Sequence, residues 1–355
     1  MKNFIKLSFI YLLIIFFLLE IGSFVASKFG LLVKNETPAL YGGVALKDSA
    51  RFARTEEQKW GGWRPINSVS RQVSECFNVE VRSNEIGARD STFVGLKDNA
   101  LFLLGDSMAE GFGVSYESTS QYLLEKKLNK DIYNFSVGHT FGPLQELLIY
   151  EEYKNKYTHH GVIVYILPVN DFTDNDRLWW EKVDTMRYRP YFSTSGDPLI
   201  PWYFPNAKKT IYDFEHASLK LKFISFVIDN FWFSNTIRTV RALFKYSMKG
   251  EYPGYFYARD YQQIHFGMAH SKIVDLAEDR DVLFVVIPSR KEIYEFAQLE
   301  NPTQYKNQIW FRKLLELSER KNVHFLDLMM SQIPEDVDSL FLCDGHWSND
   351  GNKWA

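Results

Sequence analysis

The sequence predicts an α/β fold in which helices cover both faces of a central parallel sheet. Short apolar runs typical of buried strands alternate along the chain with longer segments typical of helices, and this alternation favours parallel strands joined by helical crossovers. The run Gly161–Leu167 is continuously apolar, as expected for a strand buried on both faces. With 355 residues, the chain is long enough for one sizeable core and an insertion.

The composition is that of an ordinary globular protein, with 46% hydrophobic and 24% charged residues. The net charge of -3 gives no reason to expect a nucleic-acid partner. Aromatic residues reach 16%, which fits either a bulky core or surfaces that stack on sugar rings. Asp174 and Asp176 carry possible metal ligands, but no further oxygen ligands follow at a fixed spacing. The sequence therefore predicts no metal site and no cofactor.

The N-terminal residues 1–27 are expected to form a cytoplasmic tip and a transmembrane anchor. Lys2 and Lys6 precede Leu7–Ala26, a run of twenty residues whose one charged residue is Glu20. Such a run can span a bilayer, and leading lysines favour a cytoplasmic N-terminus. A cleaved signal peptide, which would release the chain, and a buried soluble helix are the alternatives. Glu20 lies towards the outer end, where its carboxylate could face a partner.

Periodicity assigns the remaining elements. Residues 28–75 are expected to form a linker or covering segment, and residues 76–355 the main domain. Residues 172–268 are expected to form a helical, aromatic-rich insertion, and its aromatic residues form either its own core or a glycan-binding surface. Within the insertion, the run Leu219–Phe244 suits a long helix that packs on the insertion or on a membrane surface. The expected strands are the run before Gly105, Phe77–Arg82, Asp131–Phe135, Gly161–Leu167, Val282–Ile287 and Val323–Leu328. Besides the long helix at Leu219–Phe244, the expected helices are 119–128, 142–153, Ala258–Glu278 and Pro302–Lys321.

One strand run ends in Gly105-Asp106-Ser107, and this position predicts a nucleophile. Glycine permits a sharp break in the chain, and the break presents Ser107 at the carboxyl end of the strand. A serine becomes nucleophilic when a base takes its proton, and His346 in Asp344-Gly345-His346-Trp347 can be that base. The order Ser, Asp, His fits a triad for acyl transfer with Ser107, Asp344 and His346 as catalytic residues.

Four blocks together resemble the SGNH/GDSL hydrolases: Gly105–Ser107, Asn134–Gly138, Asn170-Asp171 and Asp344–Trp347. The resemblance implies a flavodoxin-like three-layer sandwich around a parallel sheet. It also implies an oxyanion hole formed by the backbone N–H groups of Ser107 and Gly138 and the side-chain amide of Asn170. Gly142 is the alternative to Gly138, because His139 stands where the family usually has its second glycine.

The resemblance leaves the roles of several residues open. The family's acid usually stands three residues before its histidine, whereas Asp344 stands two before His346. Either the Asp344 carboxylate or a backbone carbonyl could therefore receive the imidazole N–H. His139, Asp106 and Trp347 are the candidate substrate-binding side chains.

If the chain is exported, its two cysteines, Cys76 and Cys343, lie outside the reducing cytoplasm. In an oxidising compartment they could form one disulfide, which would fix the loop of His346 to the segment before Phe77. Two buried free thiols are the alternative.

The sequence thus predicts a membrane-anchored serine esterase that faces the periplasm or the cell exterior. The segment Asn78–Arg89 resembles membrane-anchored bacterial relatives with surface-polysaccharide functions, so we expect removal of O-acetyl groups from an exported or cell-surface carbohydrate. Small esters are alternative substrates. An O-acetyltransferase with the same triad and a glycan-binding or scaffold protein that has lost catalysis are the other hypotheses. The sequence does not predict an oligomeric state.

Overall fold

The computed structural model describes residues 2–29, 31, 54–73, 76–93, 99–138, 141–183, 188–205, 211–212, 254–300 and 304–355, with isolated positions between 219 and 240. The chain divides into two compact units. One comprises residues 1–49 and 212–251, and the other comprises residues 50–211 and 252–355. Residue His139, a candidate substrate-binding side chain, lies outside the described residues.

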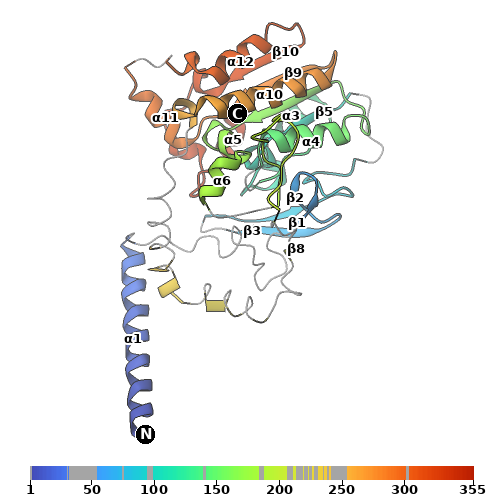
Figure 1. Ribbon diagram of the computed structural model, residues 1–355. Coiled ribbons are helices and arrows are strands. Elements are labelled where there is room, and N and C mark those ends of the chain that lie inside the picture. Colours follow the sequence, from blue (N-terminus) through green and yellow to red (C-terminus); the bar gives the residue numbers. More distant parts are fainter. Residues whose placement is uncertain are drawn as a thin grey trace. The chain divides into compact units, whose positions relative to one another are not determined.

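The larger unit is built on a five-stranded parallel sheet in the order β10-β9-β7-β5-β6. Figure 1 labels three of these strands, β5, β9 and β10. Counted along the chain within this sheet, the order is 2-1-3-4-5, which is the flavodoxin-like arrangement. The predicted parallel sheet is therefore confirmed. Its strands are β5 (Leu101–Leu104), β6 (Ile132–Asn134), β7 (Gly161–Ile166), β9 (Asp281–Val286) and β10 (Val323–Asp327).

Right-handed crossovers distribute the helices over the two faces of this sheet. The step from β5 to β6 runs towards one edge of the sheet, whereas the later steps to β7, β9 and β10 run towards the other edge. The helix of the first step, α3 (Ser120–Leu128), therefore lies on one face. The helices α4 (Pro143–Tyr153), α10 (Asp260–Ala277) and α12 (Ile309–Leu317) lie on the other, where α10 packs between the other two. The last helix, α13 (Asn349–Trp354), packs against α3, and Asn352 accepts a hydrogen bond from the Ser120 N–H at 2.9 Å.

Shorter elements connect and cover these layers. Antiparallel β3 (Val69–Val73) and β4 (Asn78–Arg82) form a ribbon, and β1 (Arg54–Gln58), β2 (Gly61–Trp63) and β8 (Ile211–Tyr212) form a small sheet. Thus the segment expected to be a linker also contains strands. The remaining helices and 3-10 turns are α2 (Ser107–Glu110), η1 (Tyr116–Ser118), α5 (Pro168–Asp174), α6 (Arg177–Val183), α9 (Gly254–Tyr257), α11 (Arg290–Ala297), η2 (Gln304–Asn307), η3 (Leu328–Met330) and η4 (Asp338–Leu340).

Two helices follow strands at positions that the sequence analysis left as loops. Helix α11 begins at a capping box in which Ser289 and Glu292 accept each other's backbone N–H groups. Helix α5 begins at Pro168, a residue suited to the first turn. The helix expected at 302–321 is shorter, because η2 precedes it and α12 begins only at Ile309.

The smaller unit contains α1 (Lys2–Lys28), whose stretch Lys6–Lys28 is long and apolar enough to cross a membrane, with a mean hydropathy of 2.5. Between residues 219 and 240, the described helical positions are Leu219, Phe223, Phe226, Val227, Phe233, Ser234, Thr236, Ile237 and Val240. Phe231 and Trp232 are not helical, so the expectation of one long helix over 219–244 is wrong. The Ser234 hydroxyl donates to the Phe231 carbonyl at 2.7 Å, which favours a turn at this point.

Candidate active site

The sharp break after β5 positions Ser107. Gly105 has φ +152°, and a Cβ atom there would lie 2.7 Å from the Ala109 Cβ, so both conformation and space require glycine. Asp106 then caps α2, because its Oδ1 accepts the Met108 N–H at 2.9 Å. Ser107 is the first residue of α2 and is 9% exposed at the carboxyl end of the sheet. In parallel α/β sheets, this end is where ligands bind.

A tight loop near the C-terminus positions His346. Gly345 has φ +90°, the Leu342 N–H donates to the His346 carbonyl at 2.7 Å, and Cys343 is bonded to Cys76 in a disulfide. Asp344 Oδ2 lies 3.0 Å from His346 Nδ1, although their angle falls short of a regular hydrogen bond. The carboxylate, rather than a distant carbonyl, therefore faces the imidazole.

The charge of Asp344 responds to this arrangement. Burial alone would raise the pKa of Asp344, but hydrogen bonding and charge attraction from His346 outweigh burial and lower that pKa. The His346 N–H also lies 3.2 Å from Asp344 Oδ1. An ionised carboxylate in this position stabilises an imidazolium.

Phe112 connects Ser107 with His346. Its ring lies 4.5 Å from the imidazole, centroid to centroid, and its backbone N–H donates to the Ser107 carbonyl at 3.0 Å. Burial raises the pKa of Asp106, the neighbour of Ser107, and the charge of His346 acts on that pKa in the opposite direction. The fold thus brings the two segments together, although no hydrogen bond joins Ser107 to His346 within the described residues. Such bonds are often long in ligand-free enzymes.

Two of the three expected oxyanion donors are engaged by carboxylates. The Asn170 Nδ2 donates to Asp106 Oδ2 at 3.1 Å and to Asp174 Oδ2 at 2.9 Å. The Gly138 N–H donates to the Glu110 carboxylate. Gly138 nevertheless lies beside Ser107, since a Cβ atom there would be 3.3 Å from the Ser107 Cβ.

Gly142, the alternative to Gly138, has a structural role at the start of α4. It precedes α4, and its N–H donates to Gln145 Oε1 at 3.1 Å. A Cβ atom there would lie 2.6 Å from Asn175 Oδ1. Close packing at the start of α4 therefore explains this glycine.

No family model and no curated protein matches the sequence. The fold is similar to that of a lipolytic protein of the G-D-S-L family from Veillonella parvula, with 9% identity, a TM-score of 0.35 and coverage of 72% of this chain and 93% of that one. It is also similar to a family 3 carbohydrate esterase from Clostridium thermocellum, with 12% identity, a TM-score of 0.35 and coverage of 72% and 90%. A salicylyl-acyltransferase from a tetracycline biosynthetic pathway shares 12% identity at a TM-score of 0.36, with coverage of 73% and 52%.

The strand order of this chain, together with Ser107 after the first sheet strand and Asn170 after the third, decides the fold. The parallel sheet with its flanking helices fits the α/β fold of the SGNH hydrolases. In this fold the blocks that carry the signature residues all follow sheet strands at the carboxyl edge, as Gly138 follows β6 and His346 follows β10.

A buried ionic network supports the turn that carries Ser107, and the sequence analysis missed it. Glu110, in the last position of α2, is fully buried and lies 2.5 Å from the Arg64 guanidinium. Gln72 Nε2 donates to the same carboxylate at 2.9 Å. Burial opposes ionisation, but the charges of Arg64 and Arg89 outweigh it and lower the pKa of Glu110. The available signal was a charged residue within the small and apolar run that follows Ser107.

Arg89 holds the same turn from the other side. Its guanidinium donates to the carbonyls of Glu110, Gly111 and Val114 and is 2% exposed. These bonds satisfy carbonyl groups at the end of α2 that have no partner within the helix. The backbone around Ser107 is therefore fixed by buried side chains from the covering strands and from the segment after β4.

Two further candidate residues act within the protein rather than towards a substrate. Asp106 is 2% exposed and bonds Met108 and Asn170, while Trp347 is 1% exposed and packs in the core with its ring 6.0 Å from Tyr165. Burial explains both, so neither is kept as a substrate-binding residue. The described residues contain no group of three or more His, Cys, Asp or Glu side chains arranged to hold a metal ion.

Buried acids lie behind Asn170. Glu146 is 1% exposed and Asp171 is 2% exposed. Burial, together with the charges of neighbouring carboxylates, raises the pKa of each well above its ordinary value. Burial likewise raises the pKa of Asp106. Like charges this close disfavour ionisation, so the region beneath the proposed oxyanion site favours protonated acids.

Five aromatic residues of the insertion form a second core. Trp180, Tyr191 and Phe204 are buried, and Trp179 and Trp202 pack against them. Arg177 lies 3.8 Å from the Trp202 ring centroid, and Arg189 lies 4.2 Å from that of Trp180. These rings therefore stabilise the insertion, as the first of the two interpretations expected.

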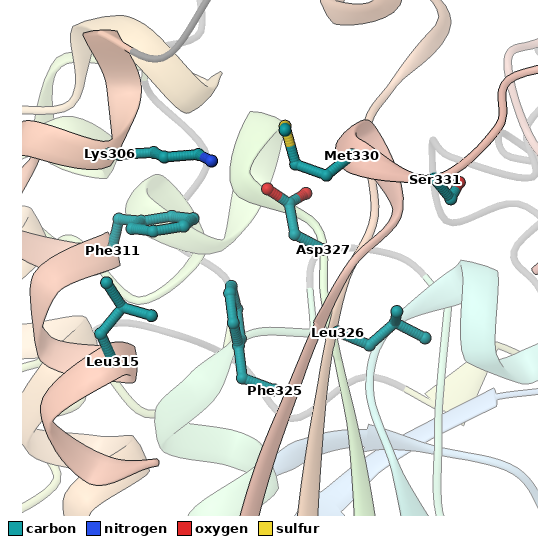
Figure 2. Close-up of a pocket in the computed structure, with 8 residues that line it drawn as sticks. All are labelled: Lys306, Phe311, Leu315, Phe325, Leu326, Asp327, Met330 and Ser331. Atoms are coloured by element: carbon teal, nitrogen blue, oxygen red, sulfur yellow. The ribbon is translucent and has the colours of Figure 1, made fainter. Parts of the chain in front are cut away.

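A pocket of about 400 Å³ lies between α12 and β10, away from the candidate catalytic residues. Figure 2 shows Phe311 and Leu315 projecting from α12 towards Phe325 of β10, with Met330 and Lys306 at the other end. The pocket is lined mainly by apolar atoms and includes neither Ser107 nor His346. It plays no part in the proposed chemistry.

Proposed function

We propose that this SGNH domain is a serine esterase that acts through an acyl-serine intermediate. Ser107 Oγ attacks the ester carbonyl carbon, and His346 takes the hydroxyl proton and returns it to the leaving alcohol. Asp344 orients the imidazole and stabilises its charged form. Water, activated by His346, then releases the acid and restores Ser107. The observation that carries this proposal is the Asp344–His346 pair, held at the same end of the sheet as Ser107.

The oxyanion of each tetrahedral intermediate needs hydrogen-bond donors. Ser107 is the first residue of a short helix, so its backbone N–H has no acceptor within that helix and can serve as one donor. Asn170 can join it by exchanging one of its two carboxylate partners for the oxyanion. Gly138 would have to release Glu110. A well-placed donor is worth about 3 kcal/mol of barrier, so we propose Ser107 and Asn170 as the main donors and Gly138 as a further one.

We further propose that the chain is anchored by α1 and acts outside the cytoplasm, in the periplasm or at the cell exterior. The apolar span Lys6–Lys28, the lysines before it and the Cys76–Cys343 disulfide support this placement. Esters available there include O-acetyl groups on exported or cell-surface carbohydrates, which we propose as substrates. Transfer of the same acyl group to a sugar hydroxyl instead of water would give an acyltransferase, and product analysis with a labelled glycan acceptor separates the two reactions.

The test is hydrolysis of a chromogenic acetyl ester by the full chain in detergent. Ser107→Ala should lower kcat by about a thousandfold or more, because the attacking oxygen is lost. Ser115→Ala is the matched control, since Ser115 is an exposed serine eight residues further along and should leave kcat unchanged. Equal activity of wild type and Ser107→Ala would exclude Ser107 as the nucleophile. No hydrolysis by the wild type of acetyl esters or acetylated glycans would favour a binding protein.

A further inference from the structure

The apolar helix α1 contains one acidic residue, and that residue has a partner within the same unit. The Glu20 carboxylate accepts the backbone N–H groups of Trp232 and Phe233 at 2.5 and 3.0 Å. One turn further along α1, the Ser23 and Thr236 hydroxyls share a hydrogen bond of 2.6 Å. A carboxylate within an apolar span is costly unless it is paired. Here its pairing groups come from the segment 231–236.

Ring contacts extend this interface along α1. The Phe16 ring lies 5.4 Å from that of Phe231 and 5.7 Å from that of Phe233, and the Phe24 ring lies 5.1 Å from that of Trp232. Positions 16, 20, 23 and 24 share one face of a helix, because their spacings are three, four and seven or eight residues. One continuous face of α1 therefore packs against the segment 231–236.

The contacts with α1 also indicate how deep the segment 231–236 would lie in a membrane. At about 1.5 Å per residue, Phe16 lies about 15 Å from Lys6 and about 18 Å from Lys28. The apolar core of a bilayer is about 30 Å thick. If Lys6–Lys28 spans that core, Phe16 lies near its middle, and Phe231 and Phe233 lie at the same depth.

We propose that the segment 231–236 lies in the membrane beside α1, and that the exposed side chains at the described positions from 219 to 240 face lipid acyl chains. This inference rests on the proposed anchoring of α1. The exposed side chains at the described positions are all apolar: Leu219, Phe223, Phe226, Trp232, Ile237 and Val240.

Membrane depth explains why Glu20 is needed. A segment that turns within the bilayer exposes backbone N–H groups where water is absent, and each must find an acceptor within the protein. The Trp232 and Phe233 N–H groups lie at the start of such a turn, and Glu20 accepts both. The Ser23–Thr236 pair satisfies two hydroxyls in the same way. In water, neither interaction would be required.

Depth-dependent fluorescence quenching tests this placement. The native cysteines are bonded to each other, so a single introduced cysteine can be labelled with a maleimide fluorophore. Phe226→Cys probes the segment, Ile14→Cys probes α1, and Leu128→Cys, an exposed apolar position on α3, is the matched control. Each full-length protein is reconstituted into phosphatidylcholine–phosphatidylglycerol vesicles. Nitroxides on the acyl chains should quench the labels at 14 and 226, whereas aqueous iodide should quench only the label at 128.

Three outcomes would overturn the inference. Iodide quenching at 226 as strong as at 128 would place the segment in water. A label at 226 shielded from both quenchers would mean that protein covers it. Recovery of the chain in the soluble fraction would refute the anchoring by α1, yet the ester assay would still report on catalysis independently.

The role of Glu20 has its own test. Glu20→Leu makes α1 more apolar and so favours its insertion, but it leaves the Trp232 and Phe233 N–H groups without their acceptor. We expect loss of acyl-chain quenching at 226 in this variant. Ile21→Leu, at an exposed neighbouring position, is the control and should retain it. Full quenching in Glu20→Leu would overturn the proposed pairing.

Discussion

The buried carboxylate of Glu110 offers a direct test of what stabilises the turn that carries Ser107, the proposed nucleophile. Its Oε1 lies 2.5 Å from the Arg64 guanidinium, with both side chains no more than 1% exposed. The Glu80–Arg82 pair is almost as close, at 2.6 Å, but its side chains are 43% and 73% exposed. The two pairs therefore differ mainly in burial, and Glu110→Gln and Glu80→Gln form a matched comparison.

We expect Glu110→Gln to lower the free energy of unfolding by about 3–5 kcal/mol, because it leaves a buried guanidinium without its counter-charge. One oxygen of Glu110 lies against the Arg64 guanidinium and accepts a hydrogen bond from Gln72, and the other accepts one from Gly138. An amide nitrogen on either side would therefore face a donor. The corresponding fall in Tm is roughly 6–20 °C. Glu80→Gln should cost about 0–1 kcal/mol, since water screens that pair.

Thermal unfolding of the full chain in detergent measures both variants, and pH gives a second signature. Because the pKa of Glu110 is lowered in the folded state, its ionisation contributes stability above the unfolded value of about 4.5, and this contribution is lost as the pH falls through the lower folded pKa. The difference between wild type and Glu110→Gln should therefore shrink in acid. Equal Tm values for Glu110→Gln and Glu80→Gln at neutral pH would refute the reasoning.

Three further predictions concern the loop of His346 and a buried acid. Asp344→Asn should lower kcat by about a hundredfold to ten-thousandfold with little change in Tm, because an amide favours the wrong imidazole tautomer; an unchanged kcat would exclude Asp344 from catalysis. The double variant Cys76→Ser, Cys343→Ser should lose about 2–4 kcal/mol of stability in denaturant unfolding, and equal midpoints for the variant and wild type would contradict this. Burial raises the pKa of Glu292 to about 7, so wild-type stability should fall as the pH rises from about 4.5 through 7. Glu292→Gln should remove up to about 3 kcal/mol of that fall, and parallel pH profiles of the two proteins would show that Glu292 is not its source.

Local sequence patterns determined the scaffold. Apolar runs bounded by turn residues identified the five strands of the central sheet to within one or two residues. This was possible because a buried strand shows its burial in its own consecutive apolar side chains. Gly105-Asp106-Ser107 after one of these runs indicated the position of Ser107. The capping signal at Ser289 and Glu292 was equally local, and it could have predicted α11.

Only the tertiary structure decided which distant groups meet. The placement of the Asp344 carboxylate opposite His346 depends on the backbone of the loop that Gly345 and the disulfide shape. The burial of Trp347 depends on Tyr165, far away in the chain. Arg64, Gln72 and Glu110 are too widely spaced for any local pattern to connect them.

The contact between α1 and the segment 231–236 shows the same division. Composition indicated that both segments are apolar and that Glu20 lies within one of them. Which groups satisfy that carboxylate depends on two segments about 210 residues apart. Short-range periodicity records which face of an element is apolar, whereas the partner of that face is chosen by packing and by the need to satisfy buried polar groups.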